Sequence, residues 1–191
     1  MLKNTNSSYG SVAKFLHWLI ALVILINFTI AFTGMELKSE PRETIFGLGK
    51  FDWYGLHKSF GILVIVLVLI RILWRFVNVQ PTLNASRFIK ISSGAVHIGL
   101  YLLLIGLPLG GYLMSSFAGY PTSFFGLFTL PNLVETNQEL AKTFNYFHTE
   151  LFADIFLGLI AIHILGALVH HFIFKDNTLR RILPFIKDKK L

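Results

Sequence analysis

The chain has 191 residues, of which 54% are hydrophobic and only 14% are charged, so it is too apolar for a soluble domain of this length and is expected to cross a membrane several times. The absence of cysteine excludes disulfides, iron–sulfur clusters, zinc–thiolate sites and covalently attached c-type haem. The formal charge of +7 does not indicate nucleic-acid binding, because the basic residues lie mostly at the edges of apolar segments, where they orient a protein in a membrane.

Four apolar segments approach or exceed the roughly 20 residues that a helix needs to cross a bilayer. They cover residues 13–33, 57–77, 95–117 and 147–174. Each is expected to be helical, because lipid cannot satisfy unpaired backbone groups. The first apolar run is as long as a span, so we predict no cleavable signal peptide. The connection 118–146 is long and contains the apolar stretch YPTSFFGLFTLP, so we expect it to lie in the outer interface or to cap the helices.

The charges predict how the segments are oriented. The N-terminus, the segment between the second and third spans and the C-terminal tail together hold twelve Lys and Arg but two acidic residues, whereas the other two connections hold five basic and eight acidic residues. Positive charge concentrates on the cytoplasmic side, which places both termini there. The predicted fold is an all-α, four-helix, up-down transmembrane bundle that forms a single domain over residues 1–191.

All histidines lie in the apolar segments or at their ends: His17, His57, His97, His148, His163, His170 and His171. An ionisable residue at membrane depth is energetically expensive, which makes each of them a candidate functional residue. His57 and His148 begin the second and fourth spans on the outer side, whereas His17 lies near the cytoplasmic end of the first span. The histidines therefore lie at two depths.

His148 and His163 are 15 residues apart on the fourth span, about 22 Å along an α-helix and about 60° beyond whole turns. Both can face the interior, His148 with His57 and His163 with His17. Neutral imidazole is an uncharged ligand that suits iron, and two axial imidazoles give a closed haem that passes single electrons. We therefore predict two haems with these four iron ligands. A histidine-lined path for a metal ion or for protons is the alternative.

His97 and His170 lie near the cytoplasmic surface, where they could bind a quinone carbonyl or relay its proton. Interfacial packing is an equally good interpretation of both. Arg71 and Arg75, at the end of the second span, could bind haem propionates or phospholipid headgroups.

The segments FLHWLIA, LHKSFGILV, AVHIGLYLLLIGLPLGGYLM and IAIHILGALVHHFIFKDNTLRRILP resemble the bacterial four-helix cytochrome b561 family over nearly the whole chain. The resemblance implies two haems b with axial ligands His17, His57, His148 and His163, and a location in the bacterial inner membrane. One member type is a superoxide oxidase, which passes electrons from periplasmic superoxide through the haems to ubiquinone. The resemblance therefore implies a superoxide:ubiquinone oxidoreductase, with a cytochrome b electron carrier for a dehydrogenase or hydrogenase as the alternative.

The outer connections bear on the identity of the electron donor. Their five basic and eight acidic residues give a net charge of −3, which does not favour the capture of an anion such as superoxide. A local cluster could still attract it, formed by Lys38, Arg42, Lys50 and Lys58. A redox protein partner would instead need an outer docking surface, for which the candidates are Phe124, Phe125 and Phe128.

Overall fold

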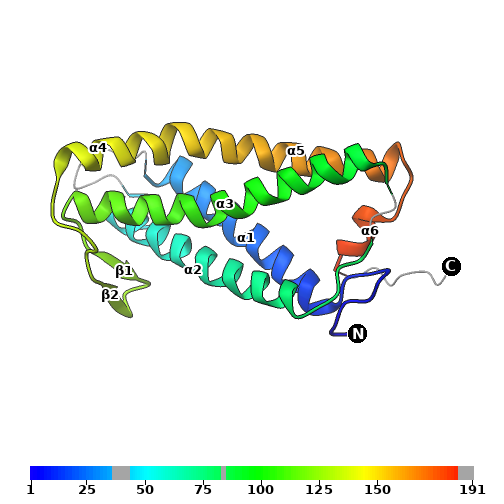
Figure 1. Ribbon diagram of the computed structural model, residues 1–191. Coiled ribbons are helices and arrows are strands. Elements are labelled where there is room, and N and C mark those ends of the chain that lie inside the picture. The colour runs from blue at the N-terminus through cyan, green and yellow to red at the C-terminus, as the bar shows by residue number, and fades with distance from the viewer. Residues whose placement is uncertain (36–43, 83–84, 185–191) are drawn as a thin grey trace. The chain divides into compact units, whose positions relative to one another are not determined.

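The computed structural model describes residues 1–35, 44–82 and 85–184. In these ranges, four helices are long and apolar enough to cross a membrane, which confirms the predicted all-α class with four spans. They are α1 (Ser11–Thr33), α2 (Lys50–Phe76), α3 (Arg87–Phe117), and a fourth that comprises α4 (Gln138–Tyr146), the π-helical turn η1 (Phe147–Leu151) and α5 (Phe152–Phe172). Figure 1 also shows a hairpin of β1 (Thr122–Phe124) and β2 (Phe128–Leu130), and the short helix α6 (Thr178–Ile182).

Three of the helices begin well before the predicted spans. α2 begins at residue 50 rather than 57, α3 at 87 rather than 95, and the fourth helix at 138 rather than 147. These extra turns mix charged and polar residues with apolar ones, and side chains cap their N-termini. The Asn137 side-chain oxygen accepts hydrogen bonds from the backbone N–H groups of Glu139 and Leu140, both at 3.1 Å. Hydropathy detects only the apolar part of each helix, so it missed these turns.

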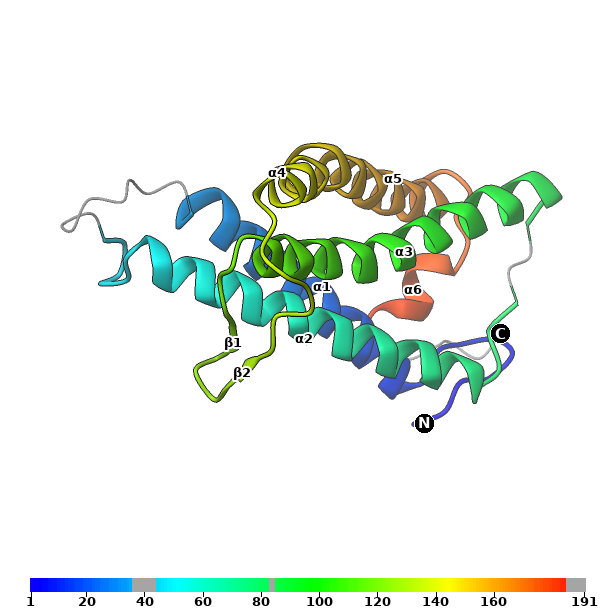
Figure 2. The same cartoon turned by 60° about the vertical axis from the view of Figure 1, so that its left-hand side comes forward.

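The connection 118–146 is structured rather than a long loop, because it contains the hairpin and α4. Phe125 and Gly126 both have positive φ, at 48° and 73°, as a tight turn between two antiparallel strands requires. The hairpin is bound to the first turns of α2 (Figure 2): the Ser59 hydroxyl donates to the Ser123 carbonyl at 3.0 Å and accepts from the Phe125 N–H at 2.9 Å.

The chain divides into two compact units, and each long helix contributes residues to both. Unit 1 comprises residues 1–20, 67–103 and 154–191, and unit 2 comprises residues 21–66 and 104–153. Unit 2 contains the hairpin, whereas unit 1 contains the N-terminal segment, the connection after α2, and α6.

In unit 1, the segments that the charge distribution placed on one side of the membrane are in contact (Figure 1). Asn4 Nδ2 donates to the Val79 carbonyl at 2.9 Å, which joins the N-terminal segment to the connection after α2. Arg181 of α6 donates to the Thr82 carbonyl at 2.8 Å, which joins the C-terminal region to the same connection. These contacts agree with a common side for the three segments, and their cytoplasmic location stays a prediction.

Candidate functional site

In unit 2, the imidazoles of His57 on α2 and His148 in η1 lie close together. Their ring centroids are 6.0 Å apart, with the ring planes at 83°, and both side chains are half-buried. A metal ion midway between two imidazoles, with metal–nitrogen bonds of about 2 Å, sets the ring centroids about 6 Å apart. The spacing of this pair therefore fits the axial ligation of one haem iron.

The backbone of α3 fixes the His148 ring. His148 Nδ1 lies 3.0 Å from the Leu107 carbonyl oxygen and donates its hydrogen to it, which leaves the Nε2 lone pair for a metal. Gly111 allows this approach, since a Cβ at that position would lie 2.8 Å from His148 Cε1. His57 Nδ1 is also buried, and the backbone of Asn27 on α1 lies close enough to act on this imidazole. A backbone group of a neighbouring helix therefore lies beside each of the two candidate ligands.

His148 also lies within a π-helical turn, η1. Such turns have i→i+5 hydrogen bonds and occur frequently at functional sites. Each residue in a π turn rotates the chain less than an α-helical residue does. The offset of about 60° between His148 and His163 was derived for an uninterrupted α-helix, and it does not apply to this one.

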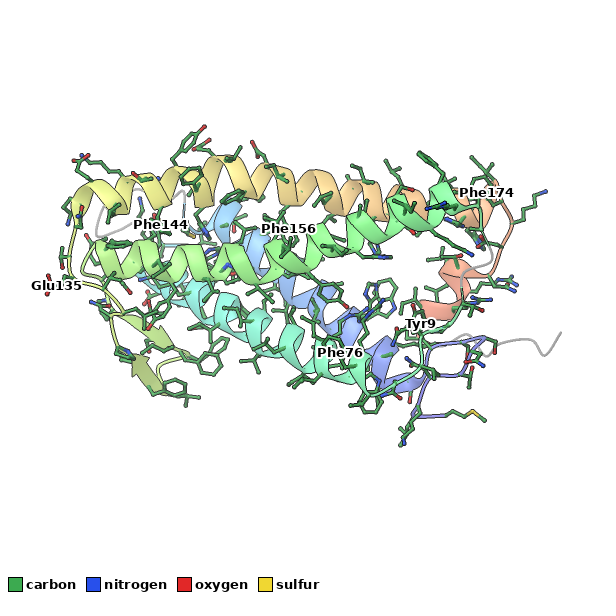
Figure 3. The ribbon with its side chains drawn as sticks, viewed as in Figure 1. Tyr9, Phe76, Glu135, Phe144, Phe156 and Phe174 are labelled. Atoms are coloured by element: carbon green, nitrogen blue, oxygen red, sulfur yellow. The ribbon has the colours of Figure 1, made fainter. Side chains whose placement is uncertain are left out.

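An apolar cavity of about 220 Å³ adjoins His148 in unit 2. Gly106 and Gly110 of α3 line it together with Phe144 of α4, which Figure 3 labels and whose ring also packs against Phe117. The two glycines come from α3, and three phenylalanines of the fourth helix complete the lining. Because a glycine lets a ligand approach the backbone, this space suits the edge of a flat macrocycle.

In unit 1, His17 on α1 and His163 on α5 form a second pair with the same spacing. Their ring centroids are also 6.0 Å apart, with the ring planes at 66°, and both side chains are half-buried. His97 of α3 lies against His163 as well, with ring centroids 5.3 Å apart, and is partly exposed. Sequence reasoning grouped His97 with His170, whereas the structure places it directly beside His163.

Arg71 brings a positive charge to the same pair. Its Nε donates to the Tyr101 hydroxyl at 3.1 Å, and its NH1 donates to the Ala13 carbonyl at 3.3 Å. The guanidinium is close enough to act electrostatically on both His17 and His163. In the described parts of the chain, no carboxylate pairs with Arg71. It is therefore available to an anionic group of a bound ligand, such as a haem propionate.

His170, the other candidate for the quinone, is bound to a carboxylate that sequence reasoning missed. His170 Nδ1 lies 2.5 Å from Asp176 Oδ2, and Asp176 Oδ1 accepts the Thr178 N–H at 2.8 Å. Partial burial raises the pKa of Asp176, but the hydrogen bonds from His170 and Thr178 outweigh it and hold the pKa below the ordinary value of 3.8. Asp176 is therefore a carboxylate at neutral pH. The polar KDN sequence directly after the last span was the available signal.

The outer cationic cluster is described only in part, since Lys38 and Arg42 lie outside the described residues. Lys50 begins α2, and Lys58 donates from Nζ to the Pro121 carbonyl at 3.0 Å. Lys58 follows His57 directly, and its charge acts on that imidazole. One cation of the cluster is therefore fixed beside the candidate outer site.

Comparison with known proteins gives consistent matches over nearly the whole chain. Residues 8–185 match the family model described as prokaryotic cytochrome b561. The chain is 34% identical over 187 residues to "Cytochrome b561 homolog 2" of Escherichia coli (strain K12), covering 94% of this chain and 93% of the relative. It is 32% identical over 184 residues to "Probable superoxide oxidase CybB" of Yersinia pestis, covering 94% and 97% respectively. The chain therefore belongs to the prokaryotic cytochrome b561 family, multi-pass bacterial membrane proteins that bind haem b and transfer electrons.

Proposed function

We propose that the protein is a superoxide:ubiquinone oxidoreductase that holds two haems b in a single domain over residues 1–191. The observation that carries the two-haem part of this proposal is that each compact unit contains an imidazole pair whose ring centroids lie 6.0 Å apart. His57 and His148 ligate the iron of the outer haem, and His17 and His163 ligate that of the inner haem. The 32% identity to a relative named as a superoxide oxidase supports superoxide as the electron donor.

Residues around the candidate iron ligands orient an imidazole and supply positive charge. When bound, the haems supply reversible one-electron chemistry. The Leu107 carbonyl keeps His148 in the tautomer that binds iron through Nε2. Lys58 provides positive charge beside His57, and in the described ranges it forms no ion pair with a carboxylate that would neutralise it. This cation favours the approach of anionic superoxide to the outer site, although the outer connections as a whole are acidic.

Ubiquinone is reduced at the other site, in unit 1, where His97 and His170 are the candidate contacts. Both termini are cytoplasmic in this proposal, and the protein lies in the bacterial inner membrane with the His57 side facing the periplasm. The contacts that join the N-terminal segment, the connection after α2, and α6 support a common side for these basic segments.

A specific observation favours one alternative, an electron carrier that receives electrons from a dehydrogenase or hydrogenase. The hairpin lies outside the four long helices and exposes Phe125, Leu127 and Phe128, with fractional exposures of 38%, 77% and 57%. Exposed apolar side chains of this kind can dock a protein partner. The transporter alternative has no such support, because the chain belongs to an electron-transfer family.

Stopped-flow spectroscopy of the purified protein tests the proposal. A superoxide source should reduce the haems, and ubiquinone should then reoxidise them. Lys58→Gln should slow reduction by superoxide, and the wild-type rate should fall as ionic strength rises, because salt screens the attraction. Lys142→Gln is the matched control, since Lys142 is an exposed lysine of unit 2 that pairs with Glu139. Normal reduction by dithionite without reduction by superoxide would reject superoxide as donor and favour the electron carrier.

A further inference from the structure

The chain reverses sharply at the end of α5 and returns to His170. The Phe174 N–H donates to the Val169 carbonyl at 3.1 Å, and the Asp176 N–H donates to the His170 carbonyl at 3.1 Å. Lys175, between them, adopts a left-handed φ of 52°. Residues after the helix thus bond back to its last turn, and a left-handed residue supplies the change of direction. The reversal places the side chain of Asp176 beside that of His170.

The carboxylate determines which nitrogen of His170 can exchange a proton. Asp176 Oδ2 lies 2.5 Å from Nδ1, and its other oxygen is held by the Thr178 N–H. Because these hydrogen bonds hold the pKa of Asp176 below its ordinary value, the acceptor stays charged and Nδ1 keeps its hydrogen. Nε2 forms no hydrogen bond within the described part of the chain. A ligand that binds His170 would therefore meet Nε2.

His170 lies on the same helix as the candidate iron ligand of unit 1. It follows His163 by seven residues, about 10 Å along α5 and within about 20° around its axis. Both residues belong to unit 1. An acceptor bound at Nε2 of His170 would thus lie on the helix face that also carries His163.

We infer that His170 is the proton donor to the acceptor that this protein reduces, and that Asp176 is the positioning residue that prepares it. The inference rests on the proposed reduction of ubiquinone. Oxidation of two superoxide ions to two molecules of dioxygen supplies two electrons, and the quinone takes up these electrons and two protons to form the quinol. The His170 imidazolium gives its Nε2 proton to a carbonyl oxygen, where a new O–H bond forms. Asp176 holds the remaining Nδ1–H, Nε2 regains a proton from water, and water supplies the second proton.

The test measures the oxidation of pre-reduced protein by a short-chain ubiquinone after anaerobic reduction with dithionite. Asp176→Asn keeps a hydrogen-bond acceptor but removes the charge, and we expect it to slow reoxidation by about 10- to 100-fold. This is less than the roughly 100- to 10,000-fold that a positioned general acid contributes, because His170 itself remains. Asp176→Glu should recover most of the rate. Haem content and reduction by superoxide should not change in either variant.

Arg181→Gln is the matched control for a purely structural role. Arg181 binds α6 to the Thr82 carbonyl at 2.8 Å without touching the dyad of His170 and Asp176, so its loss loosens the same helix and should leave the rate unchanged. Equal slowing by Arg181→Gln and Asp176→Asn would overturn the inference, because the dyad would then be only a tether.

The remaining outcomes separate this inference from the proposed function. Wild-type protein that ubiquinone does not reoxidise would refute the quinone part of the proposed function and this inference with it. A normal rate in Asp176→Asn, with wild-type protein that is reoxidised, would overturn this inference alone. If Asp176→Asn loses its haem, the reoxidation of reduced wild-type protein by ubiquinone is measured in H₂O and in D₂O instead. Because the proposed step transfers a proton, reoxidation should be slower in D₂O, and equal rates would overturn the inference.

Discussion

Substitution of Gly111 gives a sharp test of the site in unit 2. A Cβ at this position would lie 2.8 Å from Cε1 and 3.2 Å from Nδ1 of His148. Because carbon atoms in contact settle at about 3.5 Å or more, Gly111→Ala must displace the ring by roughly 0.7 Å. Metal–ligand distances tolerate only about 0.2 Å. Overpacking costs about 1–3 kcal/mol, which corresponds to haem binding that is roughly 5- to 150-fold weaker at this pair.

We expect Gly111→Ala to lower the haem content from two towards one per chain in a pyridine haemochrome assay. Gly94→Ala is the matched control on the same helix, since an added Cβ there meets nothing within 4 Å and Gly94 does not line the cavity beside His148. Alanine is also more stable than glycine within a helix, by roughly 0.5–1 kcal/mol, so this control should fold at least as well. Two haems per chain in Gly111→Ala, with an unchanged visible spectrum and unchanged midpoint potentials, would refute the reasoning.

Three further predictions concern the other candidate residues. His57→Ala should remove one haem and His17→Ala the other, as seen by redox titration of the visible spectrum; loss of the same haem from both would contradict the pairing. Arg71→Gln should lower the midpoint potential of the haem in unit 1 by an amount on the order of tens of millivolts, because a nearby positive charge stabilises an added electron, and an unchanged potential would contradict this. Since the pKa of Asp176 is lowered from 3.8, its charged form stabilises the turn after α5 fully above about that pH, and this contribution is lost as the pH falls through the lowered value. Amide hydrogen exchange in this turn should therefore accelerate in strong acid in the wild type, and Asp176→Asn should not show this change.

The four spans could be predicted from the sequence because lipid imposes long apolar helices, and hydropathy reports that constraint directly. Their starting residues could not be predicted in the same way. The apolar stretch after α3 forms a hairpin and does not extend a span. The fourth helix begins nine residues before the predicted span, where Asn137 caps its first turn. Such caps follow local side-chain chemistry, which a search for apolar segments does not register.

That His57 lies near His148 and His17 near His163 was predictable because the two depths follow from counting along the chain, whereas the helix-face argument failed at the π-helical turn η1. The features that hold these rings were not, since they depend on which backbone atoms of another helix come close. The Leu107 carbonyl and the absent side chain of Gly111 act on His148 only because α3 lies beside η1. Asp176 is separated from His170 by six residues, and only the reversal at Lys175 brings the two side chains together.

The charges beside the two histidine pairs bear on the direction of electron flow in the proposed function. α2 supplies a cation to each pair, Lys58 in unit 2 and Arg71 in unit 1. The charge of Lys58 acts on the His57 imidazole. The charge of Arg71 acts on three imidazoles, those of His17, His97 and His163. A fixed positive charge lowers the free energy of a site that gains an electron. Arg71 therefore stabilises an added electron in unit 1 and Lys58 does so in unit 2, and the balance between these two cations contributes to the direction of electron flow in the proposed function.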